Sequence, residues 1–219
     1  SNVVLTRLVT PDVFGVVMIV TTLKIGMELL TDIGIGQSVV RNENADDARF
    51  RYTAWTLQVL RSFLLCTLLL LASYPLGAYY DVPPGVIQLA ALTIIALGSA
   101  STVLYYMQRR MQLKTLNIFD LVCDIASIVL VLGFAYISPT VWSIMIANVV
   151  AGLFRAATSY LLPGARNWFA WEWGYVREVL SFGKWIFLSS MLVFLANSFD
   201  KLFLAQSLPL AVFGIYAIA

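Results

Sequence analysis

The sequence predicts an all-α fold, a polytopic bundle of transmembrane helices. Hydrophobic residues make up 60% of the chain and charged residues 12%, and the mean hydropathy is +0.85. A soluble domain holds roughly 45–50% apolar and about 25% charged residues. Apolar stretches of about 20 residues or more recur along the chain, and each can cross a hydrocarbon core of roughly 30 Å. Lys and Arg also concentrate in alternate connections, as in multi-pass membrane proteins.

The apolar stretches and the polar breaks between them place six spans. These lie near residues 13–40, 54–79, 86–107, 116–137, 140–162 and 181–205, and a further helix begins near residue 211. Prolines and capping residues punctuate the connections. They occur in Thr10-Pro11-Asp12, in the segment from Asp81 to Gly85, and in Ser138-Pro139-Thr140. Links this short make neighbouring helices antiparallel.

The distribution of Lys and Arg predicts the orientation, because cytoplasmic loops retain positive charge. One set of connections contains Arg41, Arg49, Arg51, Arg109, Arg110, Lys114, Arg166, Arg177 and Lys184. The opposite set contains only Arg7. Residues 13–40 are therefore expected to run from the outside to the inside.

A weak internal repeat suggests that the chain is part of a larger, two-lobed protein. The segments 5–20 and 204–219 align with each other, and both contain Val-Phe-Gly. We therefore expect an N-terminal lobe at residues 1–180 and the start of a second lobe at residues 181–219. The aromatic-rich connection between them, from Gly164 to Ser181, is typical of the membrane interface, and a partner-docking surface is the alternative.

Several classes of function are excluded. The chain has no histidine, which removes Ser-His and Cys-His nucleophile pairs and histidine-based zinc sites. A net charge of +2 without a basic run argues against nucleic-acid binding.

The two cysteines, Cys66 and Cys123, lie within apolar stretches and are expected to be small buried hydrophobes. We expect no cofactor and no metal.

Polar residues recur at helical spacing inside several spans, which predicts a shared polar cavity. The stripes are Thr21, Lys24, Glu28, Thr31 and Asp32; Asn117, Asp120, Asp124 and Ser127; Asn148, Gly152, Arg155 and Ser159; and Ser190, Asn197 and Lys201, with Arg61 and Gln58 as a weaker case. For any single residue, an ion pair that merely holds the bundle together is an equal alternative. Gly34 and Gly36 fit either a hinge or a tightly packed helix end. The run from Gly98 to Ser101 favours close helix packing.

Four segments together resemble the polysaccharide-transporter family of the multidrug/oligosaccharidyl-lipid/polysaccharide (MOP) flippase superfamily. They are Leu5 to Gly15 (LTRLVTPDVFG), Glu28 to Val40 (ELLTDIGIGQSVV), the loop from Arg109 to Lys114, and Phe182-Gly183 with Asn197 to Asp200. This family includes O-antigen and exopolysaccharide repeat-unit flippases. The resemblance implies a MOP/MATE-like bundle with a six-helix N-terminal lobe, which crosses a bacterial inner membrane many times.

The resemblance implies a transporter, not an enzyme, that moves a lipid-linked oligosaccharide from the cytoplasmic to the outer leaflet by alternating access. The expected partners are this substrate, the bilayer, H⁺ or Na⁺ as a coupling ion, and other membrane proteins of polysaccharide assembly. The candidate ligands of the substrate are Lys24, Arg61, Arg155 and Lys201 for its phosphate, and Asn148 and Asn197 for its sugar hydroxyls. The candidate coupling or gating acids are Glu28, Asp32, Asp120, Asp124 and Asp200.

Two alternatives remain open at the level of sequence. A cation-coupled multidrug exporter of the same superfamily would use the carboxylates and aromatic residues to bind amphipathic cations. A membrane-embedded glycosyltransferase or polymerase would act on the same lipid-linked sugars, but it is expected to carry its functional acids on a sizeable loop outside the membrane.

Overall fold

The computed structural model describes residues 10–29, 31–207 and 212, and the side chains of the last long helix as far as Ala196. Within this part of the chain, every regular element is a helix. The all-α prediction is therefore confirmed.

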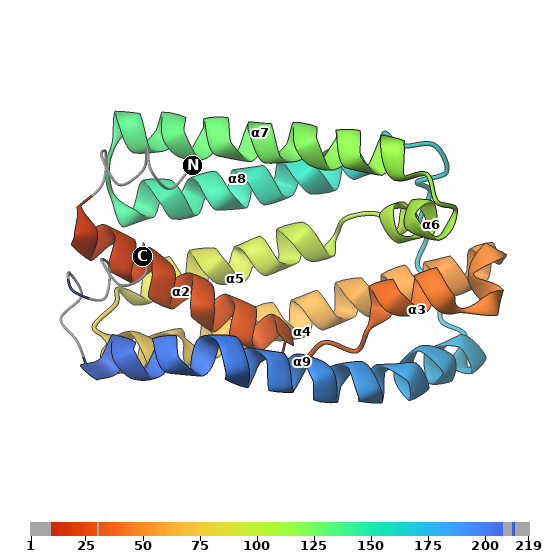
Figure 1. The fold of residues 1–219 in the computed structure, drawn as a ribbon, viewed down its shortest axis with the longest axis horizontal. Helices are drawn as coiled ribbons and strands as arrows, with labels where there is room; N and C mark the ends of the chain where they lie inside the picture. Colours follow the sequence, from red (N-terminus) through yellow and green to blue (C-terminus); the bar gives the residue numbers. More distant parts are fainter. Residues whose placement is uncertain (1–9, 30, 208–211, 213–219) are drawn as a thin grey trace.

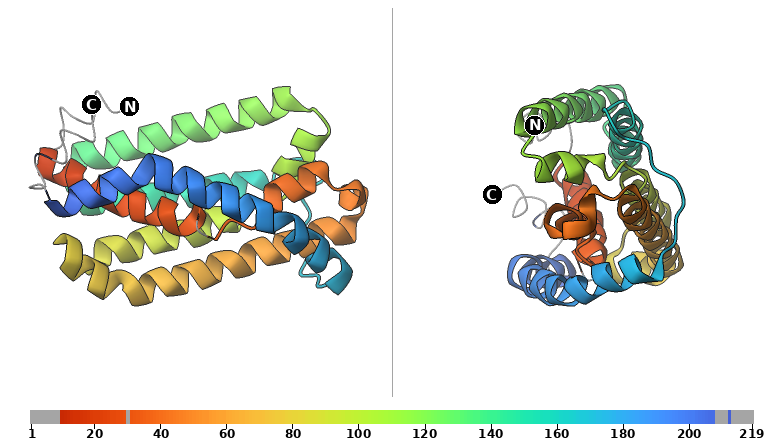
Figure 2. Two further views of the ribbon diagram at one scale, coloured as in Figure 1. Left: turned by 60° about the horizontal axis from the view of Figure 1, so that its bottom comes forward. Right: turned by 90° about the vertical axis from the view of Figure 1, so that its right-hand side faces the viewer.

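The helices run back and forth along one long axis (Figure 1). They are α2 (Pro11–Leu29), α3 (Ile35–Arg41), the 3-10 helix η1 (Glu43–Asp46), α4 (Ala48–Tyr80), α5 (Pro84–Gly98), α6 (Val103–Arg109), α7 (Leu113–Ile137), α8 (Val141–Ser159) and α9 (Trp173–Ser207). Contacts follow the order α7, α8, α5, α4, α9, and these helices form a curved wall with α2 on its inner side (Figure 2). The curve leaves the inner faces of several helices turned toward one another.

The links at one end of the bundle use the predicted turn chemistry. Helix α2 begins at Pro11. Asp81 ends α4 in the left-handed region with a φ of 53°, and Pro84 begins α5. Thr140 caps α8, because its hydroxyl accepts a hydrogen bond from the backbone N–H of Ser143 at 3.4 Å.

The predicted continuous helix over residues 13–40 is wrong, because the chain breaks into α2 and α3. Gly34 lies in the left-handed region with a φ of 63°. The Asp32 carboxylate accepts a hydrogen bond of 2.9 Å from the backbone N–H of Gly34, which stabilises the break. A Cβ at Gly34 would collide with the side chain of Ile186 on α9. Gly34 is therefore both a helix break and a point of tight packing.

The predicted continuous helix over residues 86–107 is also broken. The axes of α5 and α6 differ by 53°. A Cβ at Gly98 would overlap Ser62, so the predicted close packing is present, but the chain leaves the helix at the same place. The break leaves backbone groups without helical partners, and side chains from neighbouring helices bond to them. For example, the Ser159 hydroxyl accepts a hydrogen bond of 2.9 Å from the N–H of Ser101.

Two helices begin well before their predicted starts. Helix α4 begins at Ala48 instead of residue 54, and α9 begins at Trp173 instead of residue 181. With 33 residues, α4 is about 50 Å long and exceeds a hydrocarbon core of roughly 30 Å. Part of the connection predicted between spans is therefore helical.

Four helices are long and apolar enough to cross a membrane: α4, α7, α8 and the Trp173–Ala196 part of α9. The bent pair of α5 and α6 makes a fifth if it is one span. This number, which applies to the described residues, is lower than the six spans predicted. The difference lies in α2, whose 19 residues include Asp12, Lys24 and Glu28.

The buried apolar residues form two main clusters toward opposite ends of the bundle. The larger cluster joins α2, α4, α5 and α8 and includes Ile19, Leu69 and Ile87. The second joins α3, α4 and α9 around Phe50 and Val179. Both cysteines are buried and free, as predicted.

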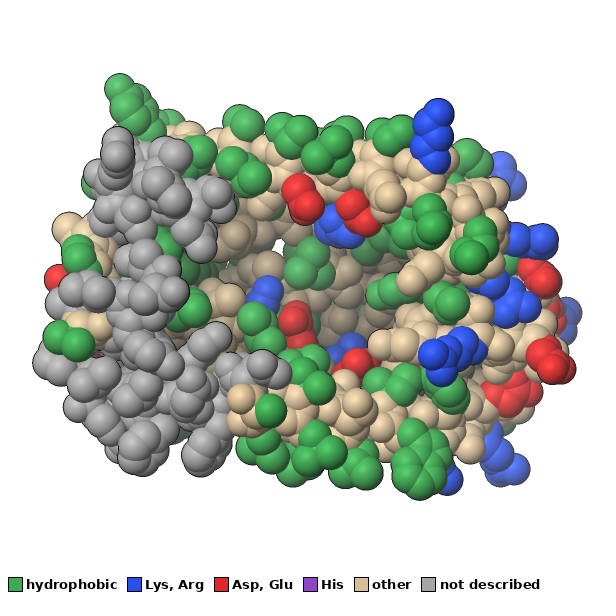
Figure 3. Space-filling view, in the orientation of Figure 1, with side chains coloured by type: hydrophobic (Ala, Val, Ile, Leu, Met, Phe, Trp, Pro, Cys, Tyr) green, Lys and Arg blue, Asp and Glu red, His purple; other side chains and the backbone are tan. Residues whose placement is uncertain are grey.

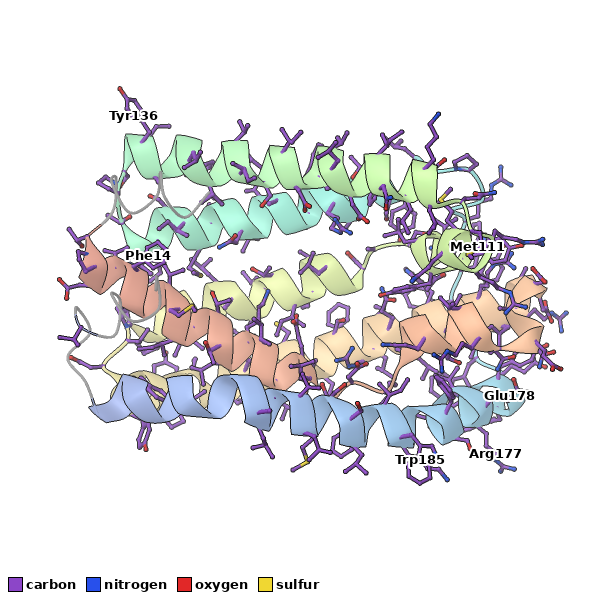
Figure 4. All side chains as sticks on the ribbon, viewed as in Figure 1. Phe14, Met111, Tyr136, Arg177, Glu178 and Trp185 are labelled. Carbon is purple, nitrogen blue, oxygen red and sulfur yellow. The ribbon has the colours of Figure 1, made fainter. Side chains whose placement is uncertain are left out.

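The outer surface of the bundle is strongly apolar. Val129 on α7 is 63% exposed and Trp185 on α9 is 68% exposed. Figure 4 shows Tyr136 and Trp185 pointing away from the bundle on opposite sides. Such a surface is typical of helices that face lipid.

Candidate functional site

A hollow lined by charged side chains opens in the middle of the bundle (Figure 3). It consists of cavities that share lining residues. The middle chamber, of about 240 Å³, shares Leu97 and Arg155 with a connecting cavity of about 300 Å³. The connecting cavity shares Gln58, Tyr105 and Gln108 with an inner chamber of about 410 Å³. We call this series the central cleft.

The middle chamber brings together polar residues from three of the predicted stripes. The residues of these stripes in its lining come from α2, α7 and α8 and include Thr21, Lys24, Asp124, Ser127, Asn148 and Arg155, and α5 adds Thr93. Lys24 is half-buried, and within the described part of the chain its ammonium group has no hydrogen bond or ion pair. A cation in this position is available to an anionic ligand.

Arg155 differs from Lys24 because it has a protein partner. Its guanidinium forms an ion pair with Asp120 across the α7–α8 contact, and it lies 5.4 Å from the centre of the Phe119 ring. The side chains of Arg155 and Asp120 remain 32% and 38% exposed. The remaining N–H groups of Arg155 can therefore still donate to a ligand in the cleft.

Arg61 joins α4 to the end of α2. It donates hydrogen bonds to the backbone carbonyl of Glu28 and, at 3.4 Å, to the hydroxyl of Thr31. A cation at the C-terminal end of a helix is favourable because the last carbonyls carry partial negative charge. Arg61 and Glu28 also line a cavity of about 260 Å³ beside the inner chamber.

Asp32, a predicted coupling or gating acid, also has a local structural role. One carboxylate oxygen accepts from the N–H of Gly34, and the other accepts from the hydroxyl of Ser190 on α9 at 3.3 Å. The side chain also lines the inner chamber. Asp32 therefore links the α2–α3 break to α9.

Several predicted site residues cannot be placed in the cleft. Asn197, Asp200 and Lys201 belong to α9, but their side chains lie outside the described residues. Of the proposed repeat, residues 5–9 of the first copy and residues 208–211 and 213–219 of the second also lie outside the described residues. Their roles stay predictions.

Three uncharged polar residues of the inner chamber were not among the predicted site residues: Gln37, Tyr105 and Gln108. Tyr105 and Gln108 are three positions apart, as are Gln58 and Arg61, which places each pair on one helix face. This spacing could have indicated a shared polar face from the sequence alone. The two pairs did not stand out, because they lie at the ends of apolar stretches, where polar residues are common.

The basic connections gather at one end of the bundle, where Lys and Arg side chains are concentrated (Figure 3). Arg109 donates to the carbonyls of Val40 and Asn42 at 3.1 and 2.6 Å. Asp46 accepts from the hydroxyl of Tyr106 at 3.0 Å and from Arg110 at 2.9 Å. These contacts fasten α3 and η1 to α6.

The same end is fastened to α9. Glu178 accepts hydrogen bonds from the amide groups of Asn42 and Asn44 at 3.0 and 3.1 Å. The hydroxyl of Tyr175 donates to Asp47 at 2.7 Å. We call the contacts around residues 42–47 the basic-end network.

Residues 4–219 match the family described as "Polysaccharide biosynthesis protein". The chain belongs to this family. It is also 23% identical over 231 aligned positions to an "Uncharacterized membrane protein in cps region" of Klebsiella pneumoniae. That alignment covers 98% of the chain and 45% of the relative, so the chain spans about half the length of the curated relative it matches. No solved structure matches.

The chain is thus a membrane protein of polysaccharide biosynthesis. In a polysaccharide biosynthesis protein, the composition of the central cleft has a clear chemical meaning. Its ammonium and guanidinium groups can bind phosphate, its amides can bind hydroxyl groups, and its carboxylates can bind protons or cations.

Proposed function

We propose that the protein is the N-terminal part of a flippase. It moves a lipid-linked oligosaccharide from the cytoplasmic to the outer leaflet of a bacterial inner membrane by alternating access. The observation that carries this proposal is the central cleft, a chain of charged and amide-lined cavities inside a bundle whose outer surface is apolar. A polar interior in a membrane protein is costly unless it serves a polar substrate or ion.

The charges of the cleft match the chemistry of the substrate. A polyprenyl-linked sugar carries phosphate or diphosphate, which requires cations, while its lipid tail can stay in the bilayer. Lys24, Arg155 and Arg61 supply cations from three different helices, and Lys201 is a fourth candidate. Asn148 lines the same chamber as Lys24 and is placed to bind sugar hydroxyls, with Asn197 proposed for the same task.

The acidic residues are candidates for coupling transport to H⁺ or Na⁺. Asp124 lines the middle chamber and Glu28 lines the cavity beside the inner one. Within the described residues neither carboxylate has a hydrogen bond or ion pair. Asp120 and Asp32 already bind protein groups, so we place Asp124 and Glu28 first among the coupling candidates and keep Asp200 with them.

The two unpartnered carboxylates also favour a second candidate, a cation-coupled exporter of amphipathic cations. Three cations around the same cleft oppose that function, because they repel a cationic drug. Growth of cells with and without the intact gene, in the presence of toxic cations, separates the two functions. Resistance without any change in surface polysaccharide would favour the exporter.

An enzyme is the weakest candidate, because the charged residues lie inside the bundle.

The proposal is tested by replacing Lys24 with Ala in the full-length protein. Loss of a charge-assisted contact to phosphate is expected to lower export of surface polysaccharide by about tenfold or more, with membrane insertion intact. Arg155→Ala is expected to act in the same direction. Lys114→Ala is the matched control, because Lys114 is exposed and lines none of the cavities described here. Normal export by Lys24→Ala would contradict the proposal.

A further inference from the structure

The orientation of the Gln58 side chain is fixed by two backbone carbonyls. Its amide nitrogen donates to the carbonyls of Gly98 and Ala100 at 2.9 and 3.1 Å. Both partners are acceptors, so the nitrogen must face them and the amide oxygen must face away. Gln58 is 9% exposed, and its oxygen has no hydrogen-bond partner among the residues that the structure describes.

Arg61, three positions further along the same face of α4, leaves a donor without a partner. Its terminal nitrogen donates to Glu28 and Thr31, but its buried Nε–H has no partner within the described part of the chain. Both Gln58 and Arg61 line the inner chamber. A buried acceptor and a buried donor without partners are unusual in a folded protein and indicate a polar group that enters from elsewhere. A hydroxyl group, which both donates and accepts, fits this pair.

The rest of the inner chamber adds the other features of a carbohydrate site. Gln37 and Gln108 provide two more amides, each able to donate and accept. The Tyr105 ring, which packs against Gly36, gives a flat apolar surface for the C–H face of a sugar ring. The charged residues of the lining are Asp32, Arg41 and Arg61. Asp32 and Arg61 are already hydrogen-bonded to protein groups, and Arg41 is exposed at the end of α3, so the amides are the main polar groups that face the chamber. The chamber is about 410 Å³, within the usual range for small-ligand pockets.

We propose that the inner chamber is a separate subsite for a neutral hexose of the lipid-linked oligosaccharide. Gln58, Gln108 and Arg61 Nε bind its hydroxyls and Tyr105 packs against its ring, while Lys24 and Arg155 in the middle chamber hold the phosphate. Arg61, a candidate for the phosphate by its charge alone, is thereby assigned to the sugar, because it lines the inner chamber and not the middle one. This inference rests on the proposed function and divides the cleft between the two parts of the substrate.

The test compares binding of lipid probes to purified full-length protein in nanodiscs. One probe is polyprenyl diphosphate without sugar. The others carry a single glucose, galactose or N-acetylglucosamine. The wild-type protein is expected to bind at least one sugar-bearing probe more tightly than the sugarless one. Gln108→Leu is expected to reduce this preference about three- to tenfold, the effect of one lost hydrogen bond, and to leave binding of the sugarless probe unchanged.

Tyr105→Leu is expected to reduce the same preference, and Tyr105→Phe to retain most of it. Because Gln108 is exposed and Tyr105 is packed, Gln108→Leu gives the test a variant that keeps the fold. Gln112→Leu is the matched control, since Gln112 is exposed at the same end of the bundle but outside the inner chamber. It should bind every probe like the wild type.

The outcomes separate the subsite from the proposed function. Equal binding of all four probes by the wild type, or a sugar preference untouched by Gln108→Leu and Tyr105→Leu, would overturn the subsite and leave the flippase proposal standing. Binding of none of the probes would contradict the flippase proposal, and the subsite with it.

Discussion

Lys24 and Arg155 line one chamber but are held in different ways. Arg155 is paired with Asp120, whereas Lys24 has no ion pair within the described residues. Leaving a cation without a directly bound partner inside a membrane bundle is unfavourable unless a ligand or water fills the space, even with the Asp124 carboxylate in the same lining. At the scale of single residues, Lys24 is therefore the more direct marker of an anionic substrate.

Asp46 makes the basic-end network sensitive to pH. The hydrogen bond from Tyr106, together with the charges of Arg110 and Arg109, lowers the pKa of Asp46 below its ordinary value of 3.8. A lowered pKa means that the carboxylate stabilises the fold fully above the unfolded-state pKa, and that this contribution is lost as the pH falls through the folded-state pKa.

Asp46→Asn is expected to lower the melting temperature by a few °C near about pH 7, and the difference from wild type should narrow near about pH 3. Thermal unfolding of the full-length protein in detergent measures both values. Glu43→Gln is the control, because Glu43 is exposed in the same loop and its side chain forms no hydrogen bond or ion pair within the described residues. A gap that widened toward low pH would contradict the assigned role of Asp46.

Helical spacing predicted Lys24, Asp124, Asn148 and Arg155 as neighbours because a charge inside an apolar stretch stands out in a sequence. It predicted Gln58 only as a weaker case, because the role proposed for Gln58 depends on which amide atom faces the carbonyls of Gly98 and Ala100. Tyr105 was missed for a related reason. An aromatic residue in an apolar stretch is read as core unless its neighbours in space are known.

At the scale of elements, the helix breaks between α2 and α3 and between α5 and α6 shape the cleft. Hydropathy is nearly continuous through the α2–α3 and α5–α6 junctions, so the sequence indicated single helices there. Between the end of α2 at Leu29 and the start of α3 at Ile35, Asp32 supplies a competing hydrogen bond to the N–H of Gly34. Residues at or beside both breaks, including Gly36, Gly98 and Ala100, line the inner chamber or its adjoining cavities.

Gly34→Ala is expected to destabilise the protein by at least about 1–2 kcal/mol, because a Cβ is unfavourable at a φ of 63° and would meet Ile186 on α9. Denaturant unfolding in detergent micelles measures the loss. Gly133→Ala on α7 is the control, because a Cβ there has open space. It should be neutral or stabilising by up to about 1 kcal/mol. Equal stability of the two variants would show that neither the left-handed backbone of Gly34 nor its contact with Ile186 requires a glycine at this position.

At the scale of the whole molecule, the curved wall and the two apolar clusters explain why the cleft lies where it does. The clusters pack toward the two ends of the bundle, and the polar stripes of α2, α7 and α8 lie between them. The sequence predicted the all-α class, the order of the helices and the basic end. It did not predict the bends, which depend on contacts between segments far apart in the chain.

The central claim, that the polar stripes surround a water-filled cleft, is tested most directly by the two faces of α7. Ser127 lines the middle chamber, whereas Val129 is 63% exposed on the apolar outer surface. Ser127→Cys and Val129→Cys are made in full-length protein whose native cysteines are replaced, and they are exposed in native membranes to a water-soluble thiol reagent. The account predicts rapid labelling at position 127 and little at 129. Labelling at 129 without labelling at 127 would contradict it.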